Sequence, residues 1–157
     1  MTQSRYVSVV FILAGLLPFM GCSPPAVFHD SKALPPRGWH QDSALVFESA
    51  VNDTLNLHEL YLVVRNTTDY GYSNLYLFLD IEFPGHQTLR DTIECTLAER
   101  NGQWTGSGFG RIKTNEFLFR DDVWFPEEGI YTFRIHHGMR QEILEGISDA
   151  GIRIQRK

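Results

Sequence analysis

The strongest constraint on the fold is a stretch, residues 74–83, in which apolar side chains occupy every second position. One face of this stretch is wholly apolar and consists of Leu75, Leu77, Leu79, Ile81 and Phe83. The other face mixes aromatic and polar side chains, namely Asn74, Tyr76, Phe78, Asp80 and Glu82. Such alternation is typical of a half-buried β-strand. Because the stretch is long for a strand, we predict that it lies in the centre of a sheet.

Similar stretches recur along the chain and are separated by turn signals. We predict strands near 43–47, 57–65, 88–97, 103–105, 130–135 and 152–154, with a strand or a loop over 112–119. Asn101-Gly102 is the strongest hairpin signal, since a type I′ turn needs positive φ at both central residues. Short strands at this spacing predict an all-β fold, an antiparallel β-sandwich of the jelly-roll or immunoglobulin-like kind.

One segment near the C-terminus departs from the β pattern. Met139, Ile143 and Ile147 recur every four residues, and Leu144 lies beside them. This spacing predicts a short helix of about two turns within residues 137–148.

The N-terminal residues are typical of a lipid-anchored protein. Residues 7–20 form an apolar run of 14 residues that follows Arg5, and this run is too short to cross about 30 Å of hydrocarbon as a helix. It ends at Gly21-Cys22, an order typical of a bacterial lipoprotein signal peptide, in which cleavage precedes Cys22 and the thiol receives a lipid. An ordinary cleaved signal peptide and a core helix with a chance cysteine are the alternatives.

These features divide the chain into three parts. We predict a lipoprotein signal peptide over 1–21, a lipidated Cys22 with a proline-rich tether over 22–38, and the β-sandwich domain over 39–157. Acyl chains would hold the mature protein on the membrane. Cys95 is then the one free thiol of the mature chain, and its alternating neighbours predict a buried position.

Charge and motif content disfavour several classes of function. The net charge of −5 and the lack of a basic stripe exclude nucleic acid as a partner. Residues 106–110 alternate glycine as a phosphate-binding loop does, but Arg111 stands where the last glycine belongs and no helix follows. We therefore expect no cofactor, no metal and no enzymatic activity, since no poised acid–base pair is visible.

Histidines and clustered carboxylates are the other candidates for chemistry. His136 or His137 could bind a metal with His58 or His86, although adjacent strand residues face opposite ways and ordinary surface or core positions are the alternative. The two acidic pairs, 121–122 and 127–128, could form a calcium loop or a glycosidase pair, or they could be charged turns around the intervening aromatic residues.

Aromatic side chains are the candidates for a binding surface. The sequence holds 11 Phe, 6 Tyr and 3 Trp, and the candidates are Tyr70, Tyr72, Tyr76, Trp104 and Trp124. Aromatic faces can stack on sugars, can form a protein-binding patch, or can simply fill the core of a sandwich. A flat aromatic row would favour a sugar, and a rimmed apolar patch would favour a protein partner.

Several short motifs occur in the order typical of a known family. They are YSNLYLF (72–78), FP (83–84), DTIECTLA (91–98), GQWTGSG (102–108), FPEEGIY (125–131), MR (139–140) and LEGISDAGIRI (144–154). On these motifs the chain resembles the gliding-motility lipoprotein GldH family of Bacteroidetes. The resemblance covers residues 57–155.

The resemblance implies a lipid-anchored accessory protein of the gliding machinery, which is linked to type IX secretion, with other gliding or secretion proteins as partners. It implies no enzymatic residues. In that phylum, surface-exported lipoproteins tend to carry acidic residues just after the cysteine, and residues 23–27 contain none. We therefore expect a periplasm-facing protein in the cell envelope. The alternative function is a carbohydrate-binding envelope lipoprotein.

Overall fold

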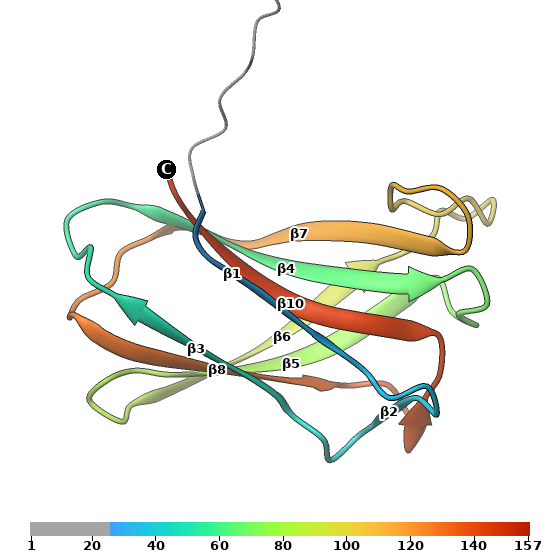
Figure 1. The fold of residues 1–157 in the computed structure, drawn as a ribbon, viewed down its shortest axis with the longest axis horizontal. Helices are drawn as coiled ribbons and strands as arrows, with labels where there is room; N and C mark the ends of the chain where they lie inside the picture. Colours follow the sequence, from blue (N-terminus) through green and yellow to red (C-terminus); the bar gives the residue numbers. More distant parts are fainter. Residues whose placement is uncertain (1–25) are drawn as a thin grey trace, which may run out of the picture.

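The computed structural model describes residues 26–157, which form ten β-strands (Figure 1). They are β1 Ala26–Ala33, β2 Trp39–His40, β3 Leu45–Val51, β4 His58–Thr67, β5 Asn74–Glu82, β6 Thr88–Thr96, β7 Ile112–Val123, β8 Gly129–His137, β9 Ile143–Leu144 and β10 Ile147–Arg156. This part of the chain contains no helix, and hence none that could span a membrane. The predicted signal peptide (1–21) and Cys22 lie outside the described residues.

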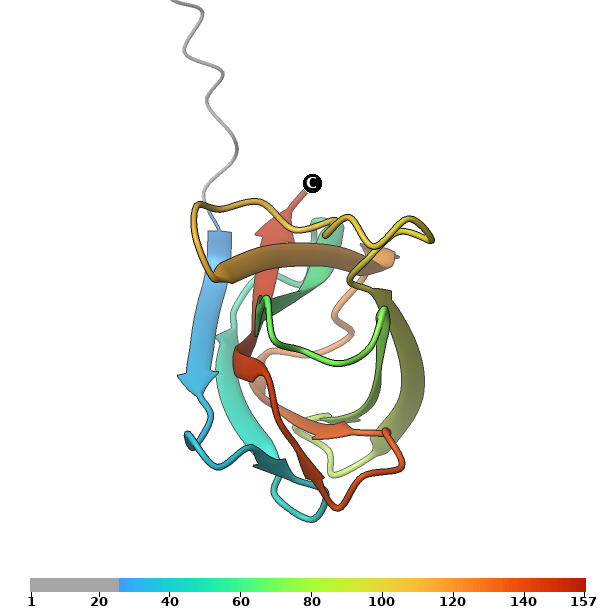
Figure 2. The ribbon, with the colours of Figure 1, turned by 90° about the vertical axis from the view of Figure 1, so that its right-hand side faces the viewer.

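The eight long strands form two four-stranded antiparallel sheets that face each other (Figures 1 and 2). The first sheet has the order β1-β10-β4-β7, and the second sheet has the order β3-β8-β5-β6. The short strands β2 and β9 pair separately at one end of the domain. All-β antiparallel architecture, as predicted from the alternating stretches, is therefore confirmed.

The core lies between the two sheets and takes one face of each strand. From β5, the side chains of Leu75, Leu77 and Leu79 are fully buried. They belong to the same hydrophobic cluster as Leu62 of β4 and Ile152 of β10 in the opposite sheet. Burial of large aliphatic side chains on this scale is the main force that holds such sheets together. The predicted apolar face of residues 74–83 is confirmed, as is the central position of this strand, since β5 lies between β8 and β6.

A turn is present where one was predicted, but it is not a type I′ turn centred on Asn101-Gly102. The Gly102 N–H donates to the Glu99 carbonyl oxygen at 2.9 Å, which places Arg100 and Asn101 at the centre of the turn, and Asn101 does not have a positive φ. Gly102 has a φ of +83°, a left-handed conformation that glycine adopts without steric cost. The Glu99 N–H donates to the Gln103 carbonyl oxygen at 2.8 Å. The turn is followed by a single bridge between Ala98 and Trp104 instead of a full strand.

The predicted C-terminal helix is wrong. Residues 138–146 form a loop that contains only the two-residue strand β9, in which Ile143 pairs with His40. Gly146 has a φ of +87°, and a Cβ at this position would lie 2.7 Å from the Tyr70 Cα. The loop is thus fitted closely against the turn around Tyr70, and the left-handed φ of Gly146 is incompatible with a right-handed helix through this residue.

The predicted tether also needs correction, because the folded domain begins earlier than Trp39. Residues Ala26–Ala33 form β1, which pairs with β10 from Gln155 down to Asp149. Most β1 side chains are exposed, so the strand is held mainly by its backbone hydrogen bonds and leaves no apolar periodicity in the sequence. Of the segment 22–38, the part from 26 to 33 therefore belongs to the first sheet.

Candidate functional site

The outer face of the second sheet carries an exposed group of apolar side chains. Tyr76 and Phe78 project from β5 on the side away from the core and are 38% and 40% exposed. Both lie on the face that the alternation of residues 74–83 places opposite the buried leucines. Exposed apolar side chains are ordinary when they occur singly, whereas neighbouring large ones form a candidate binding surface.

Tyr72 extends this group at the end of β5, and Met139, which is half-buried and packs against the core, borders it. Tyr72 is 40% exposed, and its hydroxyl interacts with the Gln141 side chain. The Met139 sulfur accepts a hydrogen bond from the Tyr76 N–H at 3.4 Å, which places the loop after β8 against β5. We call Tyr72, Tyr76, Phe78 and Met139 the aromatic surface.

Two hollows flank Met139 on this surface. One has a volume of about 330 Å³ and is lined by Phe78, Arg90 and His136, among others. The second, also about 330 Å³, is lined by Tyr72, Tyr76 and Gln141, among others. Both hollows meet at Gly138 and Met139. A methionine between two hollows suits adaptable binding, because its flexible thioether can follow the shape of a ligand.

The far half of β5 carries charge instead of aromatic rings. The Asp80 carboxylate accepts two hydrogen bonds from Arg90, at 2.5 and 2.7 Å. Glu82 pairs with Arg134 at 2.7 Å and with His86 at 3.3 Å. The hydrogen bonds from Arg90 lower the pKa of Asp80, and those from Arg134 and His86 lower the pKa of Glu82. A band of paired charges therefore borders the aromatic surface.

The Asp80–Arg90 pair is expected to make stability depend on pH. Its folded-state pKa is depressed below the ordinary value of 3.8, so the pair stabilises the fold fully above that value and loses its effect as the pH falls through the lowered pKa. Because the Arg90 side chain is largely exposed, solvent screening keeps the contribution of the pair small.

In urea titrations, Arg90→Gln should therefore lower the free energy of unfolding at pH 7, and the loss should shrink progressively as the pH falls below the ordinary Asp value of 3.8. Asp80→Asn serves as the partner variant in a double-mutant cycle. An equal loss at pH 7 and at low pH would show that Arg90 acts through packing and not through charge.

The structure separates the five aromatic residues predicted as a binding surface. Tyr72 and Tyr76 lie together on the aromatic surface. Tyr70 is buried beneath them, with its ring edge-on to Tyr72 at 5.6 Å and its hydroxyl donating to the Asn74 carbonyl oxygen. Trp104 is half-buried and packs against the core. Trp124 is 58% exposed and belongs to the β7–β8 loop, at the other end of the strands.

Phe78 and Met139 are the surface residues that were not among the predicted candidates. The alternation of residues 74–83 already places Phe78 on the same face as Tyr76, so a signal for it was present. No sequence signal places Met139 there, because its position depends on the path of the loop after β8.

Other side chains that were candidates for chemistry are engaged in the fold instead. Cys95 is fully buried as predicted, and burial raises the pKa of its thiol to about 12, which makes it unreactive. Asp121 and Asp122 both pair with the Lys157 ammonium, at 2.8 and 2.7 Å. Within residues 26–157, no three histidine, cysteine or acidic side chains gather in a way that could hold a metal ion.

The fold defines a class of protein, an all-β domain built from two four-stranded antiparallel sheets. Comparison with known proteins narrows the class. Residues 26–154 match the family described as GldH lipoprotein, and the chain belongs to this family. Membership implies a lipid-anchored protein of the cell envelope.

Two relatives cover nearly the whole chain. The gliding motility lipoprotein GldH homolog of Christiangramia forsetii is 34% identical over 161 residues, which cover 98% of each chain. The gliding motility lipoprotein GldH of Flavobacterium johnsoniae is 34% identical over 157 residues, which cover 96% of each chain. The predicted family resemblance is therefore confirmed.

Proposed function

We propose that this protein is a non-enzymatic accessory lipoprotein of the gliding machinery, linked to type IX secretion, and that it acts by binding a protein partner through the aromatic surface. The observation that carries the proposal is the exposure of Tyr76 and Phe78 on a sheet face next to Met139. Tyrosine, phenylalanine and methionine are enriched at protein interfaces. The paired charges of β5 form the polar rim that such interfaces usually have.

The polar groups of the domain support the absence of catalysis. The carboxylates of Asp80 and Glu82 are engaged by arginines, and these pairs lower their pKa values, whereas a general acid needs a raised pKa. The one described thiol, Cys95, is buried. These side chains serve structure and recognition.

The strand order supports the jelly-roll form of sandwich over the immunoglobulin-like form. Counting the eight long strands in chain order, the first pairs with the eighth, the second with the seventh, the third with the sixth and the fourth with the fifth. A jelly roll has eight strands in two sheets. In an immunoglobulin domain the first strand pairs with the second instead.

Carbohydrate binding is the second candidate. Tyr76 and Phe78 are alternate residues on one strand, so their rings emerge about 7 Å apart on one face. Arg90, Gln41 and Asp42 line the hollow beside Phe78 and could hydrogen-bond to hydroxyl groups. Fold alone does not decide between a sugar and a protein, so the test must include both.

Crosslinking in intact cells followed by purification of this protein tests the proposal. We expect gliding or secretion proteins to be recovered with the wild type and lost with Cys22→Ser, which removes the lipid anchor. Phe78→Ser should reduce recovery about tenfold or more, because a central aromatic residue at an interface often contributes more than 1 kcal/mol. Leu118→Ser is the matched control, since Leu118 is 47% exposed but lies on β7 of the first sheet.

Equal loss of partner with Phe78→Ser and Leu118→Ser would contradict the proposed surface. Recovery of no protein from any variant would favour the carbohydrate alternative, and a glycan array with the same two variants would then be the deciding measurement. Thermal unfolding of both variants checks that the domain remains folded.

We also propose that the domain faces the periplasm, as the sequence after Cys22 suggests. An external protease should then leave the protein intact on whole cells and degrade it once the outer membrane is permeabilised. Cleavage on whole cells would contradict this orientation.

A further inference from the structure

Both termini of the described domain lie at one end of the strands, together with the loops 52–57 and 124–128 (Figure 1). Ala26 at the start of β1 is in register with Gln155, and Arg156 near the end of β10 pairs with His58 at the start of β4. His58 is in turn in register with Val123, the last residue of β7. We call this the anchor end: the start of β1, the loops 52–57 and 124–128, and the C-terminus.

The anchor end exposes large apolar side chains. Leu55, in the loop between β3 and β4, is 91% exposed, and Trp124, in the loop between β7 and β8, is 58% exposed. Val27 and Leu57 are 46% and 44% exposed nearby. A mostly apolar hollow of about 290 Å³ opens beside Trp124. Single exposed apolar residues are ordinary, but a group of them marks a surface that is covered in the cell.

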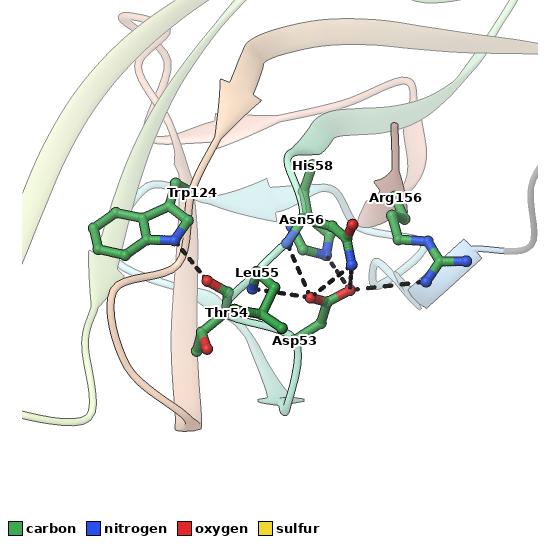
Figure 3. Close-up of polar contacts among 7 residues, drawn as sticks. All are labelled: Asp53, Thr54, Leu55, Asn56, His58, Trp124 and Arg156. Atoms are coloured by element: carbon green, nitrogen blue, oxygen red, sulfur yellow. Dashed lines mark hydrogen bonds and ion pairs between the residues drawn. The ribbon is translucent and has the colours of Figure 1, made fainter.

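Polar contacts hold these loops in place (Figure 3). The Asp53 carboxylate accepts hydrogen bonds from the backbone N–H groups of Leu55 and Asn56, both at 3.1 Å, and from the Asn56 side chain. The Trp124 indole N–H donates to the Thr54 carbonyl oxygen at 2.6 Å, which ties the two loops together. Leu55 is therefore presented to solvent by a structured turn, with its backbone N–H already hydrogen-bonded.

The length of chain before β1 limits how far this end can lie from the membrane. Ala26, where β1 begins, is four positions along the chain from the lipid-bearing Cys22, with three residues between them. A fully extended chain covers at most about 3.6 Å per residue, so this link spans no more than about 14 Å. The domain cannot move away as it could on a tether extending to residue 38.

We propose that the anchor end rests on the lipid surface itself, with Leu55 and Trp124 inserted into the interfacial region. Tryptophan is favoured there because its ring is apolar while its N–H needs a partner, and here Thr54 supplies that partner. The contact does not depend on anionic lipid, because the cations at this end are paired, Lys157 with Asp121 and Asp122 and Arg156 within 4.0 Å of Asp53. The remaining charges, Glu127 and Glu128 in the second loop, are exposed and acidic. The inference rests on the lipid anchor at Cys22.

Depth-dependent quenching tests this surface in the full-length lipidated protein, reconstituted in phosphatidylcholine vesicles. A fluorescent label on Leu55→Cys should be quenched at least several-fold more by lipids brominated near the headgroup than a label on Phe109→Cys. Phe109 is a matched control because it is fully exposed but lies in the 97–111 connection, away from the anchor end. The buried Cys95 and the acylated Cys22 leave the introduced thiol as the one that reacts.

Flotation of the same vesicles distinguishes the lipid anchor at Cys22 from the membrane contact of the anchor end. Flotation with selective quenching at position 55 supports the inference. Flotation with equally weak quenching at 55 and 109 would overturn the membrane contact but leave the lipid anchor intact. Failure to float would overturn the anchor and the inference with it.

Adding Trp124→Ser to the labelled Leu55→Cys protein should reduce quenching at position 55 if the two loops insert together. An unchanged signal would contradict joint insertion.

Discussion

Trp39→Ala is expected to lower the free energy of unfolding by about 3–5 kcal/mol, as large-to-small substitutions of buried tryptophan usually do. The Trp39 side chain is fully buried and closes the end of the core where β2 pairs with β9. Its ring lies edge-on to His137 at 5.6 Å, and its indole N–H donates to the Ser43 carbonyl oxygen at 2.7 Å. A small domain has only about 5–15 kcal/mol of stability, so this change alone could leave the domain partly unfolded.

Two further variants show which part of the effect comes from packing. Trp39→Phe keeps an aromatic ring but removes the hydrogen bond, and should cost about 1–2 kcal/mol. Trp124→Ala removes the same side chain from an exposed position and should change stability by less than about 1 kcal/mol. Urea unfolding followed by far-ultraviolet circular dichroism measures the free energy of unfolding of all three tryptophan variants without relying on tryptophan fluorescence. A loss below about 1 kcal/mol for Trp39→Ala would show that the β2–β9 end unfolds separately from the rest of the core.

Gly151→Ala is expected to detach β1 from the first sheet. A Cβ at this position would overlap the Asp30 carbonyl oxygen and would lie 2.7 Å from the Ser31 Cα. Because these are backbone atoms, the strand itself must shift, and overpacking of this kind costs about 1–3 kcal/mol. Amide hydrogen exchange in residues 26–33 should increase more than exchange in β5.

Gly71→Ala is the matched control, because nothing lies within 4 Å of a Cβ added there. Unchanged exchange in β1 of Gly151→Ala would mean that β10 absorbs the extra atom instead. Release of β1 would also lengthen the link to Cys22, so the same variant should weaken the quenching expected at position 55.

The strands that could be predicted from the sequence are those in which the pattern of side chains specifies the strand. In β5, one wholly apolar face is enough to specify a half-buried strand and to place Tyr76 and Phe78 outside. The strand β1 was missed because its exposed side chains carry no pattern, and its partner β10 is at the far end of the chain. Backbone pairing between distant segments cannot be read from local spacing.

The false helix and the scattered candidate residues have related explanations. Met139, Ile143 and Ile147 have helical spacing, yet each occupies a different environment: Met139 contacts β5, Ile143 pairs in β9, and Ile147 starts β10. Trp124 and Tyr76 were grouped only by residue type. Their separation into an anchor end and an aromatic surface follows from strand register, which places residues far apart in the sequence at the same end of the sheets.

The pairing of the first long strand with the last also sets the order in which the sheets can form. Because β1 pairs with β10, the first strand cannot find its partner until the last residues of the chain are available. The predicted cleavage and acylation at Cys22 would then act on a chain in which β1 is not yet paired. Folding with many such distant contacts is slow, so the unpaired strands stay exposed for longer than they would in a fold with local pairing. A chain that stops before Ile147 would lack the central partner of both β1 and β4, and we expect it to be degraded soon after export.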